Sequence, residues 1–209
     1  KQVNECNWVP SRITEAQLDD LVLIGALGSK DTIHWRAPGK ECPPTPQEGE
    51  VVVFVDHLAR GFKPPGSKFY RDILADFQLH PQDTGPNSIT NMCHFQVLCE
   101  VFFQGDPTME LFRDCFHPNR HTEFSDGSNT ELSGVAIQKR KEVTYPHAKL
   151  HSHPKEWNQT WFYCKHTSPA GENPLPGFCP ERLSNTHPFP QRLTAKERRK
   201  YAPQLSKIR

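Results

Sequence analysis

Residues 86–103 read PNSITNMCHFQVLCEVFF, and this stretch is apolar on nearly every side when it is wound into a helix. Pro86 suits the first turn of a helix, where a missing backbone N–H costs nothing. A helix that is apolar all round has to lie inside the molecule, so we expect this one to run through the middle of the core. Its expected core positions are Ile89, Met92, Cys93, Phe95, Gln96, Leu98, Cys99, Phe102 and Phe103.

Helical patterns also flank this stretch on both sides. Before it, apolar residues recur at intervals of three and four from Phe69 to Phe77, which predicts an amphipathic helix that ends near Leu79. After it, Asp106-Pro107-Thr108 is typical of a helix start and precedes an apolar face that extends to Phe116. Three consecutive helices, at about residues 67–117, are therefore expected to form a helical core.

The first 60 residues contain two further signals. Thr14 and Gln17 have the spacing of a capping box, so we expect a helix that begins there and ends before Gly25. A Pro-rich connection then leads to Glu50–Val55, a short β-branched run that predicts a buried strand.

The second half of the chain has a different pattern. Residues 117–129 are mostly polar and include Gly127, which indicates a loop. Short strands are expected at residues 135–137, 143–145 and 161–164, where β-branched and aromatic residues gather. We expect these three strands to form a small antiparallel sheet at about 132–166.

The C-terminal part is expected to be an arm. Residues 168–190 are rich in proline and lack periodicity, which is typical of an extended wrapping segment. Thr194–Glu197 is another capping box and opens a short basic helix. The sequence thus predicts an α+β fold, with a domain at 1–166 and a loop-rich arm at 167–209.

The overall composition excludes several classes of protein. Lys and Arg total 25 against 24 acidic residues, so the net charge of +1 does not mark the whole chain as nucleic-acid binding. No apolar run approaches the roughly 18 residues that a membrane span needs, so we expect no membrane partner. The 7 cysteines are irregularly spaced, which favours reduced thiols in an intracellular protein.

Asp83-Thr84-Gly85 is the tripeptide that retroelement proteases use for catalysis. Such a protease needs this tripeptide at the end of an apolar strand, so that two carboxylates can share a proton in a dry interface. Here Asp83 follows His80-Pro81-Gln82 and precedes Pro86, so no apolar strand leads into it. We expect a turn between two helices, with Asp83 as a local cap, and no catalytic residue.

Other catalytic or cofactor signatures are also missing from the sequence. There is no Gly-x-Ser-x-Gly elbow, no phosphate-binding glycine loop and no paired CxxC. We therefore expect no enzyme activity, no cofactor, no small-molecule substrate and no metal. The nearest metal-ligand groups are Cys115, His117 and His121, and His147, His151 and His153, for which solvated loop histidines are the simpler interpretation.

The strongest local charge is a basic patch in the arm, opposed only by Glu197. Such a patch could neutralise phosphates and bind DNA or RNA without sequence preference. A solvated tail or a nuclear localisation signal remains the alternative. The patch consists of Arg192, Lys196, Arg198, Arg199, Lys200, Lys207 and Arg209, and Lys139-Arg140-Lys141 could extend it.

Six short strings between Trp8 and Trp161 form a recognisable set: VPSRITEAQL at 9–18, IHWRAPG at 33–39, PQEGEVVVF at 46–54, RGF at 60–62, FYRDIL at 69–74 and GPNSI at 85–89. Together they resemble the gypsy-type transposon domain of plant retrotransposon proteins, which is sometimes labelled transposase. The chain departs from the family pattern at Lys63–Lys68, which is more basic and less aromatic.

This resemblance implies a nuclear or cytoplasmic plant protein derived from a mobile element, with no catalytic residue. We expect a gag-like domain that binds other retroelement proteins or itself through exposed apolar surface. The alternative is a nucleic-acid-associated module that uses the basic arm.

Overall fold

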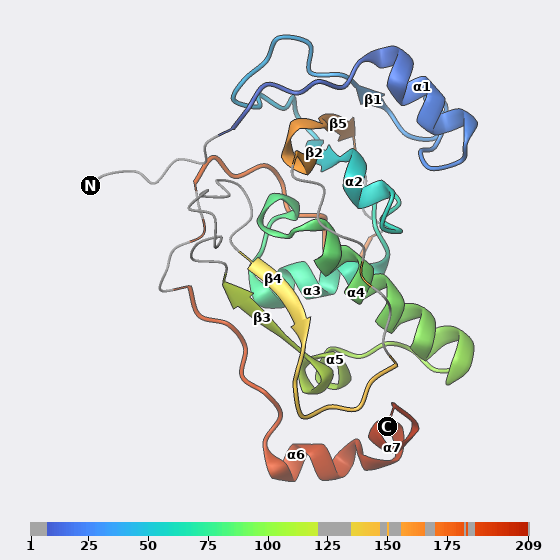
Figure 1. Ribbon diagram of the computed structural model, residues 1–209, viewed down its shortest axis with the longest axis vertical. Coiled ribbons are helices and arrows are strands. Elements are labelled where there is room, and N and C mark those ends of the chain that lie inside the picture. The colour runs from blue at the N-terminus through green and yellow to red at the C-terminus, as the bar shows by residue number, and fades with distance from the viewer. Residues whose placement is uncertain are drawn as a thin grey trace.

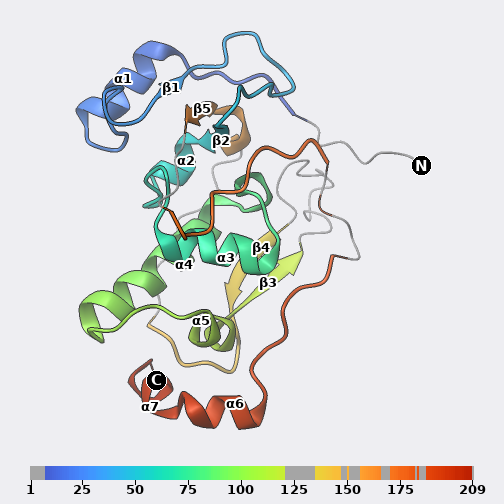
Figure 2. The same cartoon turned by 180° about the vertical axis from the view of Figure 1, so that it is seen from behind.

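The computed structural model describes residues 8–120, 135–146, 150, 156–165, 170–181, 183 and 187–208. Two small antiparallel sheets lie at different heights of an elongated molecule, and helices α3 (Lys68–Phe77) and α4 (Pro86–Val97) lie at about the height of the lower sheet (Figure 1). Helix α1 (Glu15–Leu23) lies at one end, and α6 (Ala195–Lys200) and α7 (Ala202–Ile208) lie at the other, an arrangement that is also clear from behind (Figure 2). The fold is α+β, as the sequence predicts.

The helical core forms as expected. It comprises α3 (Lys68–Phe77), α4 (Pro86–Val97) and α5 (Met109–Cys115), and α4 continues as a π-helical turn, η2 (Leu98–Phe102). The hydroxyl of Ser67 accepts the N–H of Tyr70 and thereby caps α3. Thr108 caps α5 in the same way. Between these helices the rings of Phe69, Phe77, Phe95, Phe112 and Phe116 pack edge to face or stacked.

The first sheet has the strand order β1 (Trp35–Arg36), β5 (Trp161–Lys165), β2 (Glu50–Phe54), with both pairs antiparallel. Both faces of β2 and β5 are buried. One face, with Val51, Val53, Phe162 and Cys164, joins the main core, and the other, with Val52, Phe54, Trp161 and Tyr163, forms a separate aromatic cluster. The predicted strand at 50–55 is therefore confirmed, although Val55 already begins α2 (Val55–Leu58).

The second sheet is a ribbon of β3 (Phe116–Arg120) and β4 (Val135–Lys139). The predicted loop at 117–129 is wrong at its start, because β3 follows α5 directly. The predicted pairing among 135–137, 143–145 and 161–164 is also wrong. Strand 161–165 is apolar on both faces and lies in the other sheet, whereas residues 143–145 form no strand.

Helix α4 replaces a neighbouring strand at the free edge of β4. The hydroxyl of Ser88 accepts the N–H of Ile137 at 2.9 Å, and the side-chain amide of Asn91 donates to the carbonyl of Ile137 at 2.8 Å. Opposite Ile137 stands Pro118 in β3, which has no N–H. Since Ile137 directs its polar groups away from β3, the ribbon loses no hydrogen bond at Pro118.

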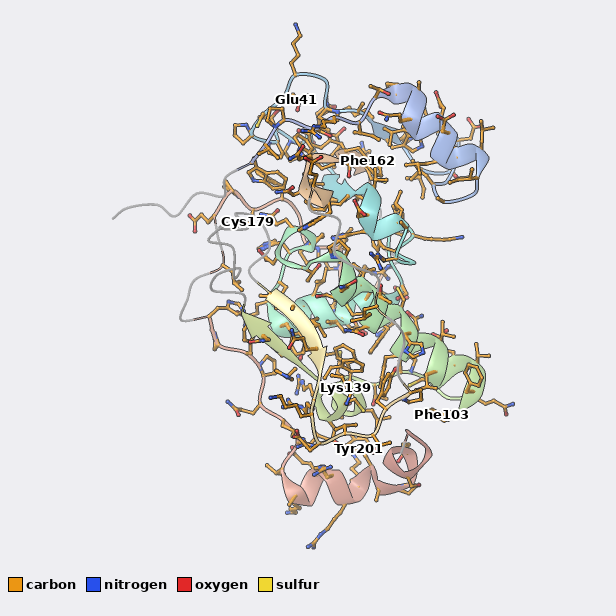
Figure 3. All side chains as sticks on the ribbon, in the orientation of Figure 1. Glu41, Phe103, Lys139, Phe162, Cys179 and Tyr201 are labelled. Atoms are coloured by element: carbon orange, nitrogen blue, oxygen red, sulfur yellow. The ribbon has the colours of Figure 1, made fainter. Side chains whose placement is uncertain are left out.

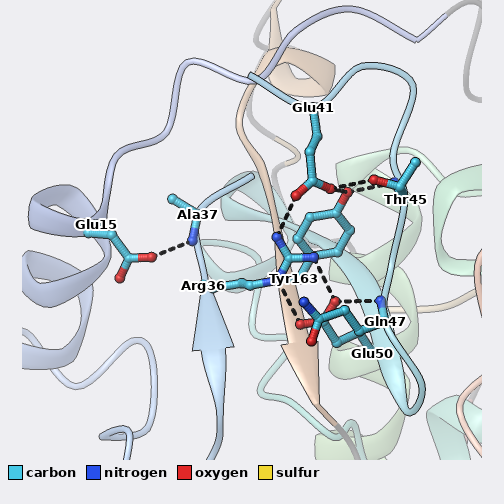
Figure 4. Close-up of polar contacts among 8 residues, drawn as sticks. All are labelled: Glu15, Arg36, Ala37, Glu41, Thr45, Gln47, Glu50 and Tyr163. Atoms are coloured by element: carbon cyan, nitrogen blue, oxygen red, sulfur yellow. Dashed lines mark hydrogen bonds and ion pairs between the residues drawn. The ribbon is translucent and has the colours of Figure 1, made fainter. Parts of the chain in front are cut away.

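The Pro-rich connection between β1 and β2 is held by a network of side chains (Figure 4). Arg36 donates to both carboxylate oxygens of Glu50 and to Glu41, and its guanidinium lies 3.9 Å from the ring centre of Tyr163. The Tyr163 hydroxyl donates to Glu41 at 2.6 Å and accepts the N–H of Thr45. These bonds lower the pKa of Glu41 to about 2, even though its desolvation acts in the opposite direction.

The remaining helices are α1 (Glu15–Leu23), η1 (Pro81–Asp83), η3 (Trp157–Gln159), α6 (Ala195–Lys200) and α7 (Ala202–Ile208). The capping boxes predicted for α1 and α6 are both present. None of the helices in the described ranges is long and apolar enough to cross a membrane.

The described parts of the C-terminal segment pack along the domain. Arg71 in α3 donates to the carbonyl of Asn173 at 2.8 Å, and His187 contacts the carbonyl of Phe77 at 2.7 Å. Leu175 is buried in the main core. The described residues 170–181, 183 and 187–190 thus contact the domain without forming a helix, while the proposed boundary at 166/167 stays a prediction.

Candidate interaction site

Asp83 is the last residue of η1, and Thr84 and Gly85 form the buried connection from η1 to α4. The carboxylate of Asp83 accepts the N–H of His80 at 2.7 Å, which is the local cap that the sequence predicts. The carbonyl of Thr84 lies 3.0 Å from Nε2 of His57, so this nitrogen carries the hydrogen. The polar groups of Asp83 and Thr84 therefore form hydrogen bonds that hold the connection between α3 and α4 in place.

His57 itself is buried and packed against aromatic rings. Its ring stacks on Trp157 at a centroid distance of 5.6 Å and contacts Phe54. Burial lowers the pKa of His57 to about 3, although the bond to Thr84 acts in the opposite direction. His57 is therefore neutral at physiological pH.

No group of three or more His, Cys, Asp or Glu side chains that could hold a metal ion occurs in the ranges that the structure describes. Of the two groups considered from sequence, Cys115 is buried in the main core and His117 lies on β3. The other members, His121, His147, His151 and His153, lie outside the described residues.

The described arginine and lysine side chains of the arm fall into two sets, an inward set that points toward the domain and an outward set that points toward solvent. Arg192 and Arg198 point inward, and their Nε atoms lie 3.0 and 2.9 Å from one oxygen of Asp114 in α5, whose side chain is only 1% exposed. Arg192 also contacts Glu142 at 2.6 Å. The expectation that Glu197 alone opposes the arm's charge is therefore wrong, because the fold brings Asp114 and Glu142 to it.

The outward set is smaller than the sequence indicates. Lys196, Arg199 and Lys200 are exposed and, at spacings of three and four, share one face of α6. The side chain of Lys207 and the whole of Arg209 lie outside the described part. Lys139-Arg140-Lys141 was the possible extension of the basic patch. Lys139 and Arg140 donate to backbone carbonyls, whereas Lys141 is exposed. Tyr201, between α6 and α7 (Figure 3), is partly buried and packs against the main core.

A second candidate surface is the far end of α4, which projects from one side of the molecule in both views (Figures 1 and 2). Val97, Val101 and Phe102 are 46%, 63% and 70% exposed there. We call these three residues the apolar helix end. Large exposed apolar side chains that cluster in this way are typical of protein–protein contact sites.

The sequence predicted Phe102 in the core, but it is exposed, and the π turn explains the difference. In an α-helix Phe102 would lie about 140° round from Val97. In η2 the N–H of Phe103 instead reaches back five residues to the carbonyl of Leu98 at 3.1 Å. The extra residue per turn shifts the register by one, so that Phe103 packs against the core and Phe102 turns outward, toward the face of Val97.

A groove lies beside the apolar helix end, between the loop after α2 and the outer face of α4. It encloses about 250 Å³. Its walls include Phe62, Tyr70, Cys93 and Val97, and the exposed side chains of Lys63 and Glu100 line it as well.

A comparison with protein families finds a match that covers the groove and the apolar helix end. The model described as "Putative gypsy type transposon" matches residues 51–120. Residues 51–120 are therefore similar to a gypsy-type transposon domain, and we call this range the gypsy-type match. The resemblance expected between Trp8 and Trp161 is thereby confirmed for residues 51–120, while the plant origin stays a prediction. Neither a curated protein nor a solved structure matches the chain.

The matched range, residues 51–120, includes the groove and the apolar helix end but not α6. Sequence reasoning assigned Phe102 to the core and so missed this site. The adjacent pair Phe102-Phe103 gave no sufficient signal, because successive helical residues can both be buried, as Ile73 and Leu74 are.

Proposed function

We propose that this chain is a non-catalytic, retrotransposon-derived, gag-like interaction domain that binds itself or other proteins of its element through the apolar helix end. The observation that carries the proposal is the exposure of Phe102, at 70%, beside Val101 and Val97. The gypsy-type match supports the retrotransposon origin and covers this surface.

The energetic reason is the hydrophobic effect. Removing a Phe or Val side chain from water contributes about 1.5–3 kcal/mol when burial is complete. Among the described residues these three side chains stay 46–70% exposed, so part of this contribution is available to a binding partner. Under this proposal the domain acts in the nucleus or cytoplasm and has no small-molecule substrate.

Sedimentation velocity over a range of protein concentrations tests the proposal. We expect the wild-type chain to self-associate and the Phe102→Ser variant to remain monomeric at the same concentrations. Leu23→Ser is the matched control, because Leu23 is 83% exposed but lies on α1, outside the gypsy-type match. A wild-type chain that is monomeric throughout, or a Leu23→Ser variant that loses association equally, would overturn the proposal.

A second candidate function rests on the outward set of cations. Lys196, Arg199 and Lys200 share an exposed face, while Arg192 and Arg198 fix α6 against Asp114. A cationic surface held in place in this way suits the phosphate backbone of DNA or RNA.

Titrations of single- and double-stranded DNA at several salt concentrations test this candidate. If the three cations each neutralise one phosphate, replacing all three by Gln reduces the slope of log K against log salt by about 2–3. A slope that does not change would exclude this face as the nucleic-acid site.

A further inference from the structure

We infer that the groove beside Val97 receives Phe102 of a second copy of this chain, which gives a closed dimer with two-fold symmetry. This inference rests on the proposed function and goes further, because it names the partner, the pocket and the geometry of the contact.

The groove suits an aromatic side chain. Its walls of Phe62, Tyr70, Cys93 and Val97 are mainly apolar, and its volume of about 250 Å³ accommodates a benzyl group. The thiol in the wall is neutral, because burial raises the pKa of Cys93 to about 11. Burying the ring there therefore brings it next to no thiolate charge.

A glycine lies where the loop after α2 comes close to α4 at the groove. Gly61 has a φ of +97°, which L side chains rarely adopt, and a Cβ there would come within 3.3 Å of the Cys93 sulfur. Glycine thus allows the loop after α2 to approach α4 closely without a side chain at this position.

The closeness of Phe102 to the groove determines the symmetry. Val97 lines the groove, and Phe102 follows it by one turn of the π-helix. When two copies place their α4 helices side by side in opposite directions, each Phe102 meets the groove of the other copy. Both sites are then used, so the assembly closes at two chains and does not extend into a filament.

The charges at the groove agree with the same arrangement. Lys63 and Glu100 are both exposed, and neither forms an ion pair with another described residue. In the antiparallel arrangement, Lys63 of one copy approaches Glu100 of the other, and the symmetry produces this contact twice. A surface with one cation and one anion on opposite sides of a two-fold axis is complementary to itself.

A charge-reversal cycle in sedimentation equilibrium tests the inference with the full chain. We expect Lys63→Glu and Glu100→Lys each to weaken the dimer about tenfold, since each replaces two attractive contacts by repulsive ones. The double variant restores both contacts with their signs exchanged and should return to wild-type affinity. Lys40→Glu, an exposed change elsewhere, should have no effect.

The outcomes separate this inference from the proposed function. A monomeric wild type rejects both. A wild-type dimer that Phe102→Ser abolishes, but whose charge-reversed double variant is no tighter than the single variants, rejects the groove and its geometry alone. Species larger than a dimer would exclude the closed arrangement. Circular dichroism of each variant confirms that these exposed substitutions leave the fold intact.

Discussion

His57 should make the stability of the folded chain depend on pH in a defined window. Its pKa is about 3 in the folded state and 6.5 as an ordinary value. Between these values the unfolded chain takes up a proton that the folded chain cannot accept. The stabilising contribution is therefore fully present above the unfolded pKa and is lost as pH falls toward 3.

The size of the effect follows from the two pKa values. A shift from pH 7.5 to pH 5.0 ends about 1.5 pH units below the unfolded pKa of 6.5. The unfolding free energy falls by about 1.4 kcal/mol for each of these units. The wild-type chain should therefore lose about 2 kcal/mol of unfolding free energy from this residue alone. Glu41, whose pKa is lowered to about 2 from 4.5, contributes its own loss mainly below pH 4.5 and so outside this window.

The assay is urea unfolding followed by tryptophan fluorescence at several pH values from 5.0 to 7.5. His57→Gln should be less stable than the wild type at pH 7.5 but should lack about 2 kcal/mol of the pH dependence, because Gln can still donate to the Thr84 carbonyl and does not titrate. His57→Phe serves as a second variant that keeps the aromatic packing on Trp157. The reasoning is refuted if the wild type and both variants lose the same free energy between the two pH values.

Three further predictions concern the fold and the arm. Ser88→Ala leaves the N–H of Ile137 without its acceptor and should cost about 1–3 kcal/mol of unfolding free energy; a change below 0.5 kcal/mol in urea unfolding would contradict this. Arg198→Ala leaves Asp114 with one arginine and should cost about 1 kcal/mol, discounted for the partial exposure of Arg198, and should speed proteolytic removal of the arm; an unchanged cleavage rate would contradict the anchoring role. The wild-type chain and an Asp83→Asn variant should both fail to cleave peptides, and hydrolysis that depends on Asp83 would show an aspartic protease.

The features that the sequence predicted correctly depend on neighbours in the chain. Ser67 and Thr108 cap helices whose N–H groups lie three residues further on, so the local order of residues was sufficient to place the starts of α3 and α5. Asp83 was correctly placed in a turn for the same reason, since its acceptor role involves His80, three residues earlier.

The candidate site was less predictable. The sequence grouped Lys196, Arg198, Arg199 and Lys200 into one basic patch. It could not separate Arg198 from the others, because Asp114, which Arg198 contacts, is distant in sequence. Phe102 was assigned to the core because α-helical periodicity puts it near Phe95 and Cys99, and only the π turn moves it outward.

By itself, the sequence determined where α1, α3, α4, α5 and α6 begin, that strands form at about 50–55 and 161–164, and that residues 51–120 resemble a gypsy-type transposon domain, because these properties are encoded in short runs of residues. The tertiary structure alone decided which strands pair, which arginines Asp114 contacts and whether Phe102 or Phe103 faces the core. The physical reason is that each of these outcomes depends on contacts between segments far apart in the chain. Burial of β5 on both faces and packing of Phe103 against the main core outweigh local periodicity.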